Sequence, residues 1–103
     1  MQMKKYSMGI DYGTLSGRVL IVDIENGQEI ASSEYAYPHA VMDDQLPSGK
    51  KLDIDYALEH PADFIDVLKI AVPDAVKKSG IDASQIIGIG VDFTSCSVMP
   101  VKA

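Results

Sequence analysis

Two short apolar runs lie on either side of a turn that is rich in glycine and hydroxyl side chains, between Met8 and Asp23. Before the turn, Tyr6, Met8 and Ile10 alternate with small residues, which is the period of a β-strand. After the turn, residues 19–22 form a second run that is mostly β-branched. The stretch therefore predicts a β-hairpin that presents the turn at one end.

The turn itself carries donors that suit a phosphate group. Thr14 and Ser16 add hydroxyl groups, and Arg18 adds a fixed charged fork. Gly13 and Gly17 can adopt positive φ angles at little cost, which would bring backbone N–H groups close to a ligand. A polyphosphate would find donors on several sides of such a turn.

Asp11 stands just before these donors, where its carboxylate would repel an anion. A bound Mg²⁺ between the two would remove the conflict, which makes Asp11 a predicted metal ligand. A second interpretation stays open, because Asp, Gly, Thr and Ser are ordinary turn formers and can build a polar hairpin turn without any ligand.

Composition limits the classes of protein that this chain can belong to. Its 103 residues, 47% of them hydrophobic, fit one globular domain with a core of moderate size. The net charge of −6 and the absence of a basic cluster argue against nucleic-acid binding. A single cysteine, Cys96, excludes an internal disulfide framework and favours a reducing, cytoplasmic setting. No segment has the length that a membrane span requires, so no membrane partner is expected.

The pair Asn26-Gly27 is a strong hairpin signal and predicts a third antiparallel strand. We place the three strands at residues 5–12, 17–24 and 28–37, with Tyr35 and Tyr37 half-exposed. The polar residues 38–53 that follow have no clear period, and they predict either a functional loop or local disorder. The acidic residues in this loop are most simply solvated.

Helical spacing becomes clear after Pro61 and ends at Gly80, which suits a C-terminal cap. Pro73 lies inside the pattern and predicts a kink or a break between two helices. His60 and His39 are more simply capping or packing residues than catalytic ones. The predicted buried face consists of Phe64, Leu68, Ala71, Val72 and Ala75.

Residues 86–91 are continuously apolar or glycine, which predicts a strand covered on both faces and parallel to its neighbour. Asp92 and the small polar residues after it would lie at the carboxyl end of this strand, where open α/β sheets collect ligands. Asp92 itself can either orient a ligand loop or only cap the strand.

This combination of segments resembles the beginning of the FGGY carbohydrate kinases, over essentially the whole chain. The likeness is carried by GIDYGT at 9–14, HPADF at 60–64 and, most specifically, GVDFTSC at 90–96. The resemblance implies the ribonuclease-H-like α/β fold of the actin and hexokinase ATPase superfamily, here a partial domain with three antiparallel strands, a helix and a returning parallel strand.

The resemblance also implies roles for individual residues, which match the family's motifs position by position. Asp11 would be the carboxylate near Mg²⁺. The first phosphate loop, facing the terminal phosphates of ATP, would consist of Gly13, Thr14, Ser16 and Arg18. The sugar would contact Thr94, Ser95 and Cys96, and we do not expect Cys96 to be a nucleophile because no histidine base is evident beside it.

The implied reaction is transfer of the γ-phosphoryl group of ATP to the terminal hydroxyl of a ketopentose, with L-ribulose as the expected sugar. Family members are several times longer than this chain, and their general-base aspartate and adenosine-binding segments come later in the sequence. We therefore expect residues 1–103 to be an N-terminal fragment of the first kinase domain, inactive alone. For the parent enzyme the expected assembly is a homodimer. The alternatives are a non-enzymatic phosphate-binding or interaction module, and a kinase for another ketopentose.

Overall fold

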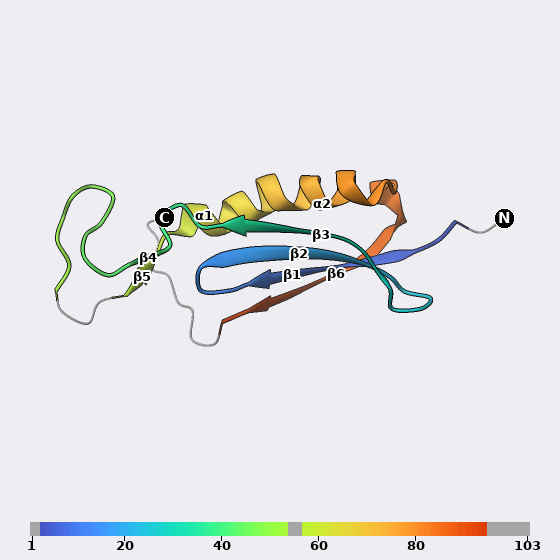
Figure 1. Cartoon of the computed structure of the whole chain (residues 1–103), viewed down its shortest axis with the longest axis horizontal. Helices are drawn as coiled ribbons and strands as arrows, with labels where there is room; N and C mark the ends of the chain where they lie inside the picture. Colours follow the sequence, from blue (N-terminus) through green and yellow to red (C-terminus); the bar gives the residue numbers. More distant parts are fainter. Residues whose placement is uncertain (1–2, 54–56, 95–103) are drawn as a thin grey trace.

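A four-stranded sheet with one long helical segment on one of its faces forms the body of the molecule (Figure 1). The computed structural model describes residues 3–53 and 57–94. The strand order is β3-β2-β1-β6. The strands span Tyr6–Tyr12 (β1), Ser16–Asp23 (β2), Glu29–Ala36 (β3) and Ile86–Phe93 (β6).

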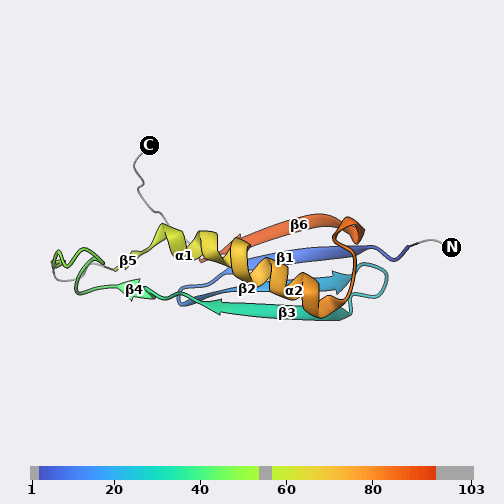
Figure 2. The same ribbon diagram turned by 90° about the horizontal axis from the view of Figure 1, so that it is seen from above.

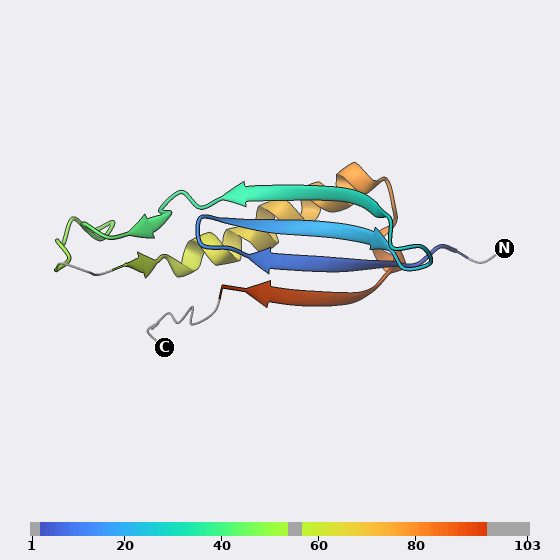
Figure 3. The ribbon, with the colours of Figure 1, turned by 60° about the horizontal axis from the view of Figure 1, so that its bottom comes forward.

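The first three strands form the predicted antiparallel meander, visible from the uncovered side in Figure 3. In the first hairpin Asp11 lies opposite Arg18. In the second, Gly27 adopts a φ of 74°, and the Gln28 N–H donates to Asn26 Oδ1 over 2.9 Å. The Asn-Gly pair therefore makes the turn that its chemistry predicts.

The helical segment runs through Pro73 without the predicted break between two helices, and a π-helical turn lies directly before the proline instead. The segment consists of α1 (Pro61–Asp66), a π-helical turn η1 (Val67–Ala71) and α2 (Val72–Ser79), and Gly80 ends it with a φ of 71°. In the wide turn the Val72 N–H donates to the Val67 carbonyl, five residues earlier. This widening lies directly before Pro73, whose ring would otherwise meet the carbonyl of the preceding turn.

The face of the helical segment that meets the sheet differs at one position from the predicted face. Val67, Ala71 and Ala75 are buried, and Phe64 and Val72 pack against this core. Leu68 is 48% exposed, so its prediction as a buried residue was wrong. The inward positions 64, 67, 71 and 75 are three and four residues apart, so the inner face passes through Val67, and Leu68 lies at its margin.

The core lies between the helix and the covered face of the sheet. It takes alternate side chains from the two central strands, with Tyr6, Met8, Ile10, Val19 and Ile21 all buried. Gly17 permits the close approach, because a Cβ at this position would overlap the Val67 side chain. Gly17 does not adopt the positive φ that we expected, and neither does Gly13.

The returning strand β6 runs parallel to β1, as predicted, after the short 3₁₀ helix η2 (Ala83–Gln85). Its burial was predicted wrongly. Apolar side chains along it are exposed, including Ile87, Ile89, Val91 and Phe93. The turn η1 and helix α2 pack over β2 and β3, away from β6, which forms one edge of the sheet (Figure 2).

Part of the segment expected to be an irregular loop is ordered as a small hairpin arm, which projects beyond the sheet (Figure 1). We define the arm as β4 (Val41–Met42), residues 43–53 and β5 (Leu58–Glu59). Its two strands are antiparallel, with Val41 opposite Glu59. No helix in the described part of the chain is long and apolar enough to cross a membrane.

Candidate phosphate and metal site

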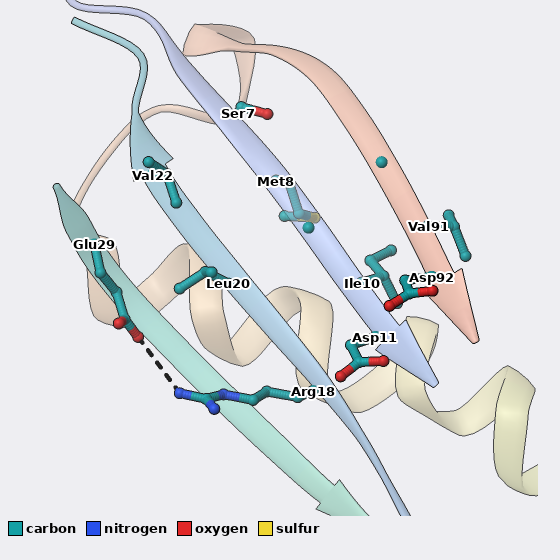
Figure 4. Close-up of a pocket in the computed structure, with 12 residues that line it drawn as sticks. Ser7, Met8, Ile10, Asp11, Arg18, Leu20, Val22, Glu29, Val91 and Asp92 are labelled. Atoms are coloured by element: carbon teal, nitrogen blue, oxygen red, sulfur yellow. Dashed lines mark ion pairs between the residues drawn. The ribbon is translucent and has the colours of Figure 1, made fainter. Parts of the chain in front are cut away.

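A shallow hollow of about 790 Å³ opens on the face of the sheet that the helix leaves free (Figure 4). Asp11 and Asp92 both line it, and so do Arg18 and Glu29. The first two side chains come from the carboxyl ends of β1 and β6, which meet at the same edge because these strands are parallel. Ligand sites in open α/β sheets form at such ends.

Asp11 and Asp92 are direct neighbours in the strand register, so two carboxylates lie side by side on an exposed surface. Adjacent strands are only about 4.8 Å apart, and like charges at this separation repel. Asp92 accepts one backbone hydrogen bond, from the Phe93 N–H over 2.9 Å. The pair offers hard oxygen ligands of the kind that Mg²⁺ prefers, and a cation between them would relieve their repulsion.

Arg18 lies on the same face as Asp11 but is turned toward β3 (Figure 4). Its guanidinium pairs with the Glu29 carboxylate over 3.7 Å, and the two side chains are 58% and 50% exposed. Surface ion pairs of this kind contribute little to stability, so the Arg18 guanidinium can readily exchange the Glu29 carboxylate for another anion. The predicted role of Arg18 in phosphate binding stays a prediction.

The turn between β1 and β2 is held closed by its own backbone. The Gly13 N–H donates to the Ser16 carbonyl over 2.9 Å, and a Cβ on Gly13 would lie 3.0 Å from that same oxygen. Glycine is therefore needed here for a close approach within the turn, and not for a positive φ.

The turn and the end of β6 lie beside each other, although they are far apart in sequence. Thr14 Oγ1 is 3.4 Å from Thr94 Oγ1, and the Thr94 N–H donates to the Tyr12 carbonyl over 3.0 Å. The structure thus brings the predicted phosphate turn to the first of the predicted sugar residues. Ser95 and Cys96, the other two, lie outside the described residues.

Tyr37 supports the turn from below and was missed as a site residue, since we expected it to be half-exposed. It is buried; its hydroxyl donates to the Gly13 carbonyl over 2.9 Å, and its N–H donates to the Leu15 carbonyl over 3.0 Å. Burial, followed by the nearby Glu59, raises the pKa of Tyr37 to about 12. Its position at the end of the third strand, level with the turn, was the signal that could have identified it.

An aromatic stack joins this support to the helix. The Phe64 ring lies between those of Tyr12 and Tyr37, at centroid distances of 4.8 and 5.1 Å. The Tyr12 hydroxyl donates to the Phe64 carbonyl over 3.0 Å, and burial raises the pKa of Tyr12. The turn therefore rests on a packed layer that links β1, the end of β3 and α1.

Comparison with known proteins gives close relatives of one kind, although no family model matches the sequence. The chain is 52% identical over 100 residues to a ribulokinase of Shouchella clausii, which covers 96% of this chain and 18% of the relative. It is 47% identical over 97 residues to a ribulokinase of Mycolicibacterium smegmatis, covering 92% and 17%. Among solved structures, gluconate kinase from Lactobacillus acidophilus matches with a TM-score of 0.67 and 26% identity, over 88% of this chain and 16% of that one.

These findings confirm the resemblance to sugar kinases and the expected fold class. The sequence is homologous to the N-terminal part of ribulokinases, and the chain spans less than a fifth of the length of the relatives that it matches. The likeness to a sugar kinase structure extends over 88% of this chain.

Proposed function

We propose that this chain provides the phosphate turn and the metal carboxylate of an ATP-dependent sugar kinase, whose substrate is L-ribulose. The observation that carries the proposal is the meeting of Asp11, Asp92 and the hydroxyl-bearing turn at one edge of the sheet. The sequence around these residues is about half identical to that of ribulokinases. Residues 1–103 would then be the N-terminal part of the first kinase domain.

The residues at this edge fit a nucleotide with its metal. Asp11, with Asp92 beside it, would hold Mg²⁺, while Gly13, Thr14, Ser16 and Arg18 would donate to the terminal phosphates of ATP. Bound Mg²⁺ neutralises charge on the phosphoryl group during transfer. The turn is supported by Tyr37 through the Gly13 carbonyl, which keeps its donors in place before the ligand arrives.

The sugar would lie against the end of β6, at Thr94, Ser95 and Cys96. The 3.4 Å approach of the Thr94 and Thr14 hydroxyl groups supports this placement, because phosphoryl donor and acceptor must meet. The product would be the 5-phosphate of L-ribulose. Removal of the proton from the sugar hydroxyl needs a general base, which we assign to another part of the parent enzyme. We place the parent in the cytoplasm, a reducing setting in which the Cys96 thiol would stay free.

A chimera tests this proposal directly. The corresponding segment of the Shouchella clausii ribulokinase, 52% identical over 100 residues, is replaced by this chain. We expect the chimera to form ADP when L-ribulose is added. Asp11→Ala in the chimera should lower kcat by about 10²–10³-fold, as loss of an electrostatic group in an active site does.

Asp44→Ala is the matched control, since it removes an exposed carboxylate from the arm and should leave kcat unchanged. A chimera that folds, as judged by circular dichroism, and forms no ADP would overturn the proposal. Full activity of the Asp11→Ala chimera would remove Asp11 from the site. The chain alone should form no ADP with the sugar, because the general base lies elsewhere.

A further inference from the structure

Two histidines and a buried carboxylate gather at the base of the arm, away from the hollow that holds Asp11. His39 precedes β4, His60 follows β5, and Asp63 lies in the first turn of α1. His60 and Asp63 belong to the HPADF segment, of which the proposed kinase site uses only Phe64, in the aromatic stack below the turn. These residues form the one set of three or more potential metal ligands within the described ranges, 3–53 and 57–94.

The three side chains are already in contact. His39 Nδ1 lies 2.7 Å from Asp63 Oδ1, and the His39 N–H donates to Asp63 Oδ2 over 3.1 Å. The rings of His39 and His60 stack with centroids 4.1 Å apart. One ligand atom from each of the three residues can be chosen so that all lie within 4.8 Å of one another.

A second carboxyl group beside them lacks a partner. Glu59 Oε2 is buried and has no hydrogen-bond partner among the described residues. Asp63 is itself only 1% exposed, so negative charge is concentrated at a place that water reaches poorly. A cation bound here would compensate both carboxyl groups.

We propose that His39, His60 and Asp63 bind a divalent transition-metal ion of the zinc class at the base of the arm. Imidazole nitrogen with a carboxylate oxygen is a donor set for such ions, whereas Mg²⁺ prefers oxygen alone. The ion takes the place of the proton that His39 Nδ1 and Asp63 Oδ1 now share, and this proton leaves to solvent. Bound there, it clamps both ends of the arm to α1.

The second histidine must change its present contacts to take part. His60 Nδ1 accepts the Ala62 N–H over 3.1 Å, which caps α1. The stacked rings lie at 16° to each other, so their lone pairs do not converge on one point. Binding therefore turns one of the two rings. It also either moves the ring proton of His60, so that Nε2 can bind the ion, or breaks the hydrogen bond from the Ala62 N–H to Nδ1. The Ala62 amide signal therefore reports on binding.

The test uses the 103-residue chain without a histidine tag, titrated with ZnCl₂ and, separately, MgCl₂ in a calorimeter. The chain has only two histidines, so the ring ¹⁵N signals in NMR belong to His39 and His60 alone. We expect one equivalent of Zn²⁺ to shift both rings and the Ala62 amide, and Mg²⁺ to shift none of them. Cys96→Ser, tested alone, should bind Zn²⁺ as wild type does, which excludes the thiolate as the ligand.

Substitution of each ligand gives the quantitative test. His39→Ala and His60→Ala should each weaken Zn²⁺ binding at least about tenfold, and so should Asp63→Asn. Asp44→Asn, an exposed carboxylate in the same arm, should bind as wild type does. The proposal fails if wild type binds no Zn²⁺, if only one ring shifts, or if affinity survives in both histidine variants. The first two outcomes use only the wild-type chain, so they hold even if a variant does not fold.

Discussion

The central strands of the sheet and its edge strand β6 differ in what covers them. Under the helix, alternate side chains of β1 and β2 are buried, and Ile21 on β2 is 0% exposed. On the edge strand β6 the equivalent isoleucine, Ile89, is 62% exposed although it lies beside the buried Met8 in register. β2 and β6 are both rich in apolar residues, yet within the described residues only the apolar side chains of β2 are covered by the helix.

The contrast shows that an apolar strand sequence does not by itself determine whether the strand's side chains are buried. An apolar strand is stable at an edge if the neighbouring strand supplies its backbone hydrogen bonds, and β6 obtains these from β1. Its side chains then contribute little to stability, because their apolar area stays in water. We call β1, β2, β3 and the helical segment the covered half of the molecule. The covered half should therefore contribute most of the folding free energy.

The largest expected effect compares Ile21→Ala with Ile89→Ala. Ile21→Ala leaves a cavity under the helix and should lower the free energy of unfolding by about 2–5 kcal/mol. Ile89→Ala removes side-chain atoms that are already in water, and it should change stability by less than about 0.5 kcal/mol. Urea denaturation followed by circular dichroism measures both. Equal losses in the two variants would mean that β6 is covered in solution, for instance by a second copy of the chain.

Adding a methyl group at a glycine tests the same difference between the covered strands and β6, because it should destabilise the first and stabilise the second. At Gly17 an added Cβ would overlap Val67, so Gly17→Ala should force strand and helix apart at a cost of about 1–3 kcal/mol. At Gly90 an added Cβ meets nothing within 4 Å, and Gly90→Ala should stabilise the chain by about 0.5 kcal/mol through the unfolded state. Thermal unfolding of both variants should show Tm shifts of opposite sign. Two negative shifts would contradict an open environment at Gly90.

The meander, the helix with its end at Gly80 and the parallel return of β6 followed from local patterns, because hairpin turns and glycine caps act over a few residues. The burial of single side chains did not follow in the same way. Leu68 was placed inward by a four-residue step from Phe64, whereas the buried face takes the three-residue step to Val67, and helical periodicity allows either. The role of Gly17 depends on Val67, fifty residues later in the chain, and nothing near Gly17 in sequence identifies that contact.

In the candidate site, too, the local features were predictable from the sequence and the long-range contacts were not. Asp11 and the turn were predictable because strand, carboxylate and donors are consecutive in sequence. The supports of the site were not, since Tyr37 reaches the turn only through the register of three strands. The pairing of His39 with Asp63 likewise requires the arm to fold back on α1, and no periodicity of either segment indicates it.

Tyr37→Phe tests how firmly the covered half holds the turn. It removes the hydrogen bond to the Gly13 carbonyl and should cost about 1 kcal/mol of stability. Thr94→Val, at the end of β6, removes only a hydroxyl whose two contacts are both 3.4 Å long, and it should cost less. Urea unfolding of the two variants gives the comparison, and a larger loss in Thr94→Val would reverse it.

The pKa of Tyr37 adds a pH dependence to this pair. The folded-state pKa is raised to about 12, above the ordinary value near 10, so the folded chain holds this proton more tightly than the unfolded chain. The resulting stability is complete below about pH 10 and is lost as pH rises toward about 12. Tyr37→Phe should therefore show a smaller loss of stability than wild type between about pH 10 and 12. Equal slopes would mean that the tyrosine is solvated.

The smallest effect compares two aspartates, one on each half. Asp74 joins α2 to β3, accepting from Ser33 Oγ over 2.7 Å and pairing with Lys78 over 2.9 Å. The Ser33 hydrogen bond, followed by Lys78, lowers the pKa of Asp74, so its contribution is present above about pH 4 and is lost as pH falls through the lowered value. Asp74→Asn should destabilise the chain at neutral pH and converge with wild type in acid.

Asp92→Asn should have the opposite sign at neutral pH, because it removes repulsion from the Asp11 carboxylate beside it on β1. The gain should be a few tenths of a kcal/mol, about the range of cross-strand pairs. High salt should reduce this gain, since the repelling groups are exposed to solvent. Unfolding of both proteins with and without Mg²⁺ tests whether the two carboxylates share a cation. If they do, Mg²⁺ should stabilise wild type and remove the stability advantage of Asp92→Asn. A variant that stays more stable than wild type in Mg²⁺ would show that the two carboxylates do not act together.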